Sequence, residues 1–141
     1  MAWVNLDRPE VRNALNPDLI RELTEVMDWL NSRDDIRVII LKGNGKAFCA
    51  GADLAYMKEM AGYSYNQNIA DAEKLSKLFQ TIYFCDKAVV VCVHGACIGG
   101  ANGIIAAADI VIAERETKFA FTEVRLGLTP ATISPFVVSK I

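Results

Sequence analysis

Residues 88–103 read AVVVCVHGACIGGANG and combine an apolar run with a cluster of small residues. Its apolar run, Ala88–Val93, is typical of a strand buried on both faces, and the small residues after it lead into a short helix over Gly99–Ala108. A strand that leads into a helix is the building block of a parallel or mixed sheet with crossover helices. The stretch therefore predicts an α/β fold.

The same alternation of strands and helices continues on both sides. Asn16-Pro17-Asp18 is a typical helix start, with a side-chain cap, a proline in the first turn and an acid facing the helix dipole. Apolar residues then recur at helical spacing as far as Leu30. We find no repeat or linker in residues 1–141 and expect one domain, or part of one. Further strands are expected at Ala2–Asp7, Arg37–Lys42, Asp109–Ala113 and Lys118–Phe121, and further helices over Asn66–Phe84 and from Thr129-Pro130 onward.

The glycines between residues 95 and 103 do not form a nucleotide-binding motif. Gly95 and Gly100 have the spacing of a phosphate-binding loop, but Ala101-Asn102 replaces the Lys-Ser/Thr pair that the motif needs. No two of these glycines lie two residues apart, so the dinucleotide fingerprint is absent as well. The junction can present a backbone N–H, at Gly100, to a developing oxyanion. Close packing between helix and strand is the alternative explanation.

Two further segments carry candidate chemistry. Residues 47–54 (AFCAGADL) have small side chains that let the backbone approach a ligand, next to the free N–H groups of a following helix. An ordinary tight turn is the alternative there. Glu123 lies at a strand end among apolar residues, where desolvation would suit a general base. An ion pair with Arg125 or a solvated edge charge is its alternative.

The composition excludes several classes of protein. The chain has 141 residues, 52% of them apolar, and 15 basic against 17 acidic residues give a net charge of −2. A nucleic-acid-binding protein would show a basic stripe that neutralises phosphates. The sequence has no run of 18 apolar residues. It also does not start with the basic and then apolar segments of a secretory signal. We therefore expect no nucleic-acid partner, no membrane span and a cytoplasmic protein.

The four cysteines and the single histidine do not predict a metal site. Cys92, His94 and Cys97 form a C-x-H-x-x-C pattern, but zinc usually takes four ligands and no nearby Asp or Glu completes the set. Cys92 and His94 lie two residues apart on a strand and point the same way, which disfavours a nucleophile–base pair. We expect reduced, buried thiols at these positions and at Cys49 and Cys85.

Five spaced motifs together resemble the crotonase (enoyl-CoA hydratase/isomerase) superfamily. They are RPEVRNALN at 8–16, FCAGADL at 48–54, VHGACIGGA at 93–101, ADIVIA at 108–113 and FTEVRLGLTP at 121–130. The tail TEVRLGLTPATISP is most similar to the bacterial methylglutaconyl-CoA or carboxygeranoyl-CoA hydratase-like subgroup. The resemblance implies a crotonase-like spiral of β-β-α units. It also implies a C-terminal helical region that is absent here, so residues 1–141 are expected to be a truncated core domain.

The resemblance also implies the residues of the site. In the superfamily the thioester carbonyl of an acyl-CoA lies between two backbone N–H groups, which fall here on Ala52 and Gly100. Glu123 matches the second of two glutamates that handle one water molecule. Coenzyme A is part of the substrate, so no separate cofactor and no metal are implied. Substrate contacts are expected from Arg12, Ala14, Leu15, Ala50, Asp53 and Leu54 on the coenzyme A side, from Met57 on the acyl side, and from Gly99 and Gly103.

The first glutamate position of the family falls on Gly103, which has no side chain. Three functions then stay open: hydration by Glu123 with Asn102 or a backbone group positioning the water, isomerisation by one carboxylate, or acyl-CoA binding without turnover. The leading prediction is an enoyl-CoA hydratase-type lyase of fatty-acid, branched-chain amino-acid or isoprenoid breakdown. The complete subunit is expected to form a homotrimer or hexamer.

Overall fold

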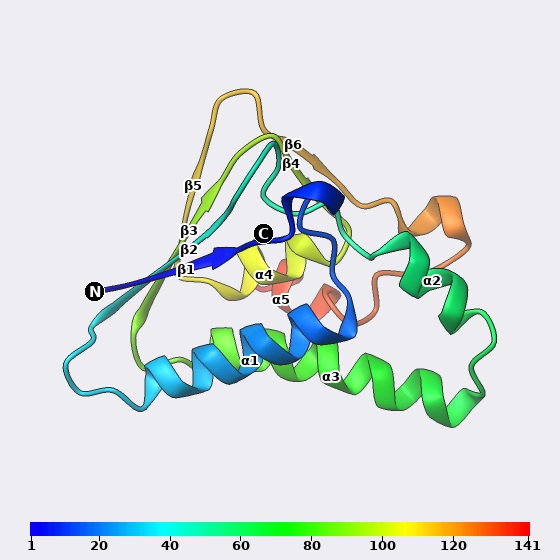
Figure 1. Ribbon diagram of the computed structural model, residues 1–141, viewed down its shortest axis with the longest axis horizontal. Helices are drawn as coiled ribbons and strands as arrows, with labels where there is room; N and C mark the ends of the chain where they lie inside the picture. Colours follow the sequence, from blue (N-terminus) through cyan, green and yellow to red (C-terminus); the bar gives the residue numbers. More distant parts are fainter.

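The computed structural model describes residues 1–141, apart from the side chain of Leu126. Strands and helices are interleaved along the chain (Figure 1). The strands are β1 (Ala2–Leu6), β2 (Val38–Gly43), β3 (Ala88–Val93), β4 (Ala96–Ile98), β5 (Ile110–Ala113) and β6 (Lys118–Ala120). The α-helices are α1 (Pro17–Asn31), α2 (Leu54–Met60), α3 (Tyr65–Tyr83), α4 (Ala101–Ala107) and α5 (Ser134–Val138), and the short 3-10 helices are η1 (Pro9–Val11) and η2 (Glu123–Leu126).

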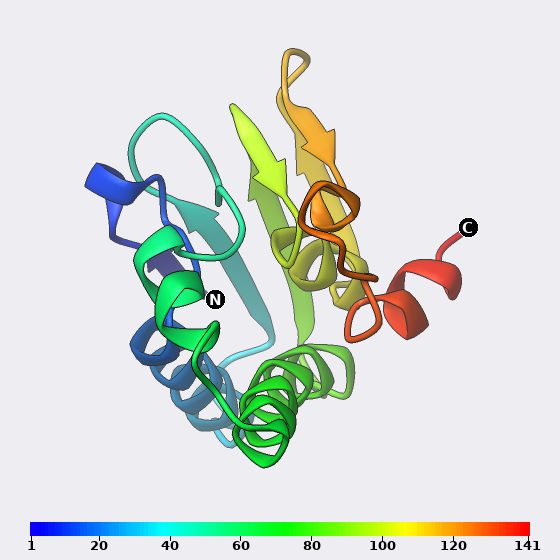
Figure 2. The ribbon, with the colours of Figure 1, turned by 90° about the vertical axis from the view of Figure 1, so that its right-hand side faces the viewer.

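Four parallel strands, in the order β1-β2-β3-β5, form the main sheet. The central strands β2 and β3 are rich in branched apolar residues, and Ile39, Leu41, Val89 and Val91 on them are fully buried. Helices α1 and α3 lie side by side beneath the sheet (Figures 1 and 2). The core therefore forms between one face of this sheet and the apolar faces of two helices.

A second, smaller set of parallel contacts runs beside the main sheet. Strand β4 pairs with β6, and single bridges join Leu15 to Ala52 and Cys49 to Cys97. Each strand of the main sheet is thus followed by a short extended segment and then by helix, which is a β-β-α unit. The predicted α/β fold with this repeating unit is confirmed.

Of two helix starts predicted from the local sequence, the structure confirms that of α1 but not that of the last helix. The side chain of Asn16 accepts a hydrogen bond from Leu19 N at 2.9 Å, so the predicted cap is confirmed. Thr129-Pro130 does not open the last helix, which begins at Ser134 with Pro135 in its first turn. A turn fills the gap, because Ser134 N donates to Pro130 O at 3.0 Å.

Among the described residues, no helix is both long and apolar enough to cross a membrane.

Candidate active site

Asn13 fixes the loop that carries the first predicted oxyanion donor. Its buried amide nitrogen donates to the carbonyl oxygens of Asn44, Ala47 and Phe48 at 2.8–3.1 Å. Its Oδ1 accepts from the backbone N–H of Arg8. One buried side chain thereby satisfies four backbone groups, and the loop after β2 is held rigidly against the segment before α1.

Ala52 keeps a backbone N–H that the fold does not use. Leu15 N donates to Gly51 O at 2.7 Å, and Asp53 N donates to Leu15 O at 2.9 Å. In a parallel bridge the residue between these two partners turns its own N–H to the other side. Among the described residues, Ala52 N donates to no acceptor.

The second predicted donor, Gly100, lies directly after β4. The preceding N–H, that of Gly99, donates to Ala120 O at 2.8 Å and so belongs to the β4–β6 pairing. Gly100 N has no acceptor in the part of the chain that the structure describes. The loop of Ala52 lies close to β4: Gly51 has a φ of +87°, and a Cβ on it would be 2.8 Å from Ile98 O, so glycine permits this approach. The sequence therefore places two unpaired N–H groups on neighbouring segments.

Glu123 opens η2 rather than ending a strand. Its Oε2 is buried without a hydrogen-bond partner among the described residues. Its Oε1 lies 3.3 Å from where a side chain on Gly99 would begin. Arg125 forms no ion pair with it in the described structure. A buried carboxylate oxygen without a partner is costly, which makes this group a candidate for chemistry.

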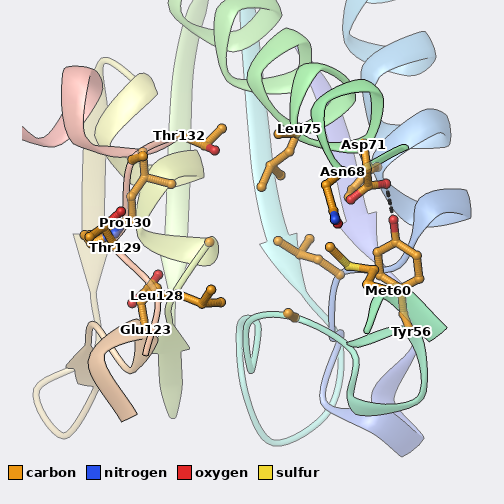
Figure 3. Close-up of a pocket in the computed structure, with 17 residues that line it drawn as sticks. Tyr56, Met60, Asn68, Asp71, Leu75, Glu123, Leu128, Thr129, Pro130 and Thr132 are labelled. Carbon is orange, nitrogen blue, oxygen red and sulfur yellow. Dashed lines mark hydrogen bonds between the residues drawn. The ribbon is translucent and has the colours of Figure 1, made fainter. Parts of the chain in front are cut away.

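One cavity brings the two donors and the carboxylate together. It has a volume of about 240 Å³, and Ala52, Gly100, Glu123 and Leu15 all line it. Figure 3 shows two walls, one from α2 and α3 and the other from the segment between Glu123 and Ile133. Glu123 is on the second wall.

The wall from α2 and α3 carries a polar group that the sequence did not point to. The Tyr56 hydroxyl donates to Asp71 Oδ1, and Asn68 lies beside them (Figure 3). Burial and the neighbouring Asp71 raise the pKa of Tyr56, so the phenol keeps its proton and acts as the donor. On α3, the face of Asn68, Asp71 and Leu75 lines the cavity, whereas Ile69 is 44% exposed.

Gly103 lies in the core and does not line the cavity. A Cβ at this position would be 2.5 Å from Phe79 Cζ and 2.6 Å from Ile133 Cγ2. Two apolar side chains therefore occupy the space that a side chain at position 103 would need. Asn102, the other candidate for positioning a water, donates its amide to Gly99 O and Ala120 O at 3.1 and 3.0 Å and does not line the cavity either.

The residues expected on the coenzyme A side have different surroundings. Asp53 caps α2 and forms an ion pair with Arg8 at 2.9 Å, which holds the pKa of its carboxyl below the ordinary value. Arg12 is exposed and Leu54 is 75% exposed. Met57, expected on the acyl side, does not line the cavity, whereas Met60, about one turn further along α2, does. Ala14 and Gly99 are buried and Ala50 is half-buried. None of the three lines the cavity.

The cysteines are all free thiols. Burial raises the pKa of Cys49 to about 11 and that of Cys97 to about 12, so neither is a nucleophile at neutral pH. His94 Nε2 is 2.9 Å from Gly45 O. Among the described residues, no three His, Cys, Asp or Glu side chains are grouped so as to hold a metal ion.

Comparison with known proteins places this geometry in a family. The family model for enoyl-CoA hydratase/isomerase matches residues 1–141, and the chain belongs to that family. The crystal structure of an enoyl-CoA hydratase from Shewanella pealeana superposes with a TM-score of 0.95 at 39% identity, over 96% of this chain and 51% of that one.

Curated relatives include both activities of the family. The chain is 35% identical to a short-chain-enoyl-CoA hydratase of Clostridium acetobutylicum, over 92% of this chain and 49% of that protein. It is 34% identical to a mitochondrial Δ(3,5)-Δ(2,4)-dienoyl-CoA isomerase of Mus musculus, over 89% of this chain and 41% of that protein. The chain spans about half the length of the relatives it matches.

Proposed function

We propose that this chain carries the site of an enoyl-CoA hydratase, which adds water across the double bond of an α,β-unsaturated acyl-CoA. The N–H groups of Ala52 and Gly100 would hold the thioester oxygen. As the oxygen of water bonds to C3, the double-bond electrons move toward the thioester and its oxygen becomes an enolate oxyanion. Donors aimed at that oxygen stabilise the transition state more than the substrate, which lowers the barrier.

One observation carries this proposal. Two backbone N–H groups without acceptors, at Ala52 and Gly100, line the same cavity as the unpartnered carboxylate of Glu123. Glu123 Oε2 is buried, where a carboxylate oxygen is normally satisfied within a fold, whereas Ala52 is exposed and Gly100 half-buried. The buried oxygen without a partner, next to two N–H groups that no described acceptor uses, supports a ligand that contacts all three groups. An enolate oxygen accepts from the two N–H groups, and the reaction needs the carboxylate to move a proton.

The test is removal of the charge at Glu123. In Glu123→Gln we expect hydration of short enoyl-CoAs to fall by about 10²–10⁴-fold, the usual contribution of a general acid or base. Glu116→Gln is the matched control, because Glu116 is exposed in the turn before β6. Unchanged turnover in Glu123→Gln would remove this residue from the mechanism.

Isomerisation of an enoyl-CoA is the second candidate, and the packing at Gly103 favours it. With that position filled by Phe79 and Ile133, one carboxylate at Glu123 suffices to move a proton between two carbons of the acyl chain. The two reactions differ in their use of solvent. Product formed in ¹⁸O-labelled water contains ¹⁸O after hydration and none after isomerisation.

Wider properties of the complete protein stay predictions. These are contact of coenzyme A phosphates with Arg12 or another surface cation, the methylglutaconyl-CoA or carboxygeranoyl-CoA hydratase-like subgroup, a homotrimeric or hexameric subunit assembly, and a cytoplasmic location. Arg12 is an exposed residue, which supports the first of them, because a cation at the surface can meet an anion.

A further inference from the structure

The packing around Gly103 raises the question of which group handles the second proton of hydration. Addition of water forms a C3–O bond and a C2–H bond, so one proton leaves the water and one reaches C2. Residue 103 is glycine and supplies no carboxyl group, and a Cβ there would already lie 2.5 Å from Phe79 Cζ and 2.6 Å from Ile133 Cγ2. A second carboxylate has to come from elsewhere on the cavity wall.

Asp71 is the other carboxylate that lines the cavity. Of the residues that line it, only Glu123 and Asp71 carry a carboxyl group, and they lie on opposite walls (Figure 3). Asp71 comes from α3, a helix far from Glu123 in the sequence. A substrate held in a cavity of about 240 Å³ between these walls has a carboxylate on each side. A water molecule, which takes about 30 Å³ in the liquid, fits beside a short acyl chain.

The hydrogen bonding of Asp71 links α3 to α2 through one carboxyl oxygen and leaves the other oxygen unused among the described residues. Its Oδ1 accepts from the Tyr56 hydroxyl, and no described residue donates to Oδ2. No ion pair with a Lys or Arg is formed by it in the described structure. It lies beyond the first turn of α3, which begins at Tyr65, so it does not benefit from the positive end of the helix dipole. One oxygen is oriented and the other is left for a ligand.

We infer that Asp71 is the second acid/base group of the reaction and that Tyr56 positions it. The inference rests on the hydratase function proposed above. Glu123 lies against Gly99, next to the donor Gly100, and is therefore assigned to the proton at C2. Asp71, on the opposite wall, takes a proton from water as its oxygen bonds to C3. Glu123 starts this step in its acid form and delivers its proton to C2, so that Asp71 ends protonated and Glu123 ionised. Exchange of one proton with solvent then restores both groups, and one water is consumed for each hydroxyacyl-CoA formed.

The experiment compares two activities of the full chain and its variants. The first is hydration of crotonyl-CoA, which needs both carboxylates. The second is deuterium exchange at C2 of butyryl-CoA in D₂O, which needs the oxyanion donors and one base but no water addition. Asp71→Asn is suited to this test because the new side-chain oxygen can still accept from Tyr56. Glu73→Gln removes one charge from the exposed face of the same helix and is the matched control.

In Asp71→Asn we expect hydration to fall about 100-fold or more and exchange at C2 to stay within about threefold of wild type. Tyr56→Phe should lower hydration by about tenfold and leave exchange unchanged, since it frees Asp71 without removing it. Glu73→Gln should change neither activity.

Three results would overturn the inference. Normal hydration by Asp71→Asn would show that the proton passes elsewhere, and an equal loss of hydration and exchange would show that Asp71 supports the fold or binding instead. Hydration by a wild-type protein that shows no exchange at C2 would refute the division of roles. In each of these cases the proposed function stands. If the wild-type protein hydrates no enoyl-CoA, the proposed function and this inference fail together.

Discussion

Replacement of Gly103 by alanine should destabilise the fold, although alanine is the better helix former. The new Cβ would lie 2.5 Å from Phe79 Cζ and 2.6 Å from Ile133 Cγ2, and both side chains are buried. Overpacking of a core costs about 1–3 kcal/mol. Removal of a glycine from a helix interior returns about 0.5–1 kcal/mol. With two close contacts, we expect a net loss of about 1–2 kcal/mol in the free energy of unfolding.

Urea unfolding measures this loss as a lower midpoint at constant slope. Phe79→Leu removes the ring atoms that the new Cβ meets, so Gly103→Ala should cost less in that background than in wild type. Gly62→Ala is the control, because its Cβ meets only Glu59 O at 3.6 Å and should be neutral or slightly stabilising. A Gly103→Ala protein as stable as wild type would refute the packing argument. So would a Gly103→Glu variant that folds normally and hydrates faster.

Two further predictions concern groups outside the cavity. Arg8 holds the pKa of Asp53 in the folded protein below its ordinary value of 3.8. The ion pair therefore stabilises the fold fully above pH 3.8, and this stabilisation is lost as the pH falls through the lower pKa of the folded state. Acid titration of the unfolding free energy should therefore be less steep in Asp53→Asn, and an unchanged curve would contradict the assignment. Cys97, fully buried and with a pKa of about 12, should react with thiol reagents only after unfolding, whereas half-buried Cys92 reacts in the native protein; labelling both at the same rate would contradict this.

The sequence predicted the elements whose signals are local. Asn16-Pro17 marks the start of α1 by its cap and its proline, and the apolar runs of β2 and β3 are long enough to indicate buried strands. Strand β4 has three residues among glycines, and its pairing with β6 depends on a segment some twenty residues away. Such a strand has no periodicity to detect, so the junction after β3 was expected to pass directly into helix.

The site was predictable only in part for a similar reason. Ala52, Gly100 and Glu123 follow strands at positions that family motifs mark, and the structure brings all three to one cavity. Tyr56 and Asp71 come from two helices joined by a loop, and no local sequence pattern predicts the contact between them. The spacing of Asn68, Asp71, Ala72 and Leu75 on one face of α3 was the available signal, but a polar start to an apolar face resembles a solvated helix end.

If two backbone N–H groups polarise one thioester carbonyl, as proposed, the vibration of that carbonyl reports the effect. Infrared difference spectra of a ¹³C-labelled, unreactive acyl-CoA should show the carbonyl stretch at lower frequency when bound than in water, because hydrogen bonds to oxygen weaken the C=O bond. The shift should persist in Glu123→Gln, which leaves Ala52 and Gly100 intact. A bound carbonyl with the frequency of the free thioester would contradict the account.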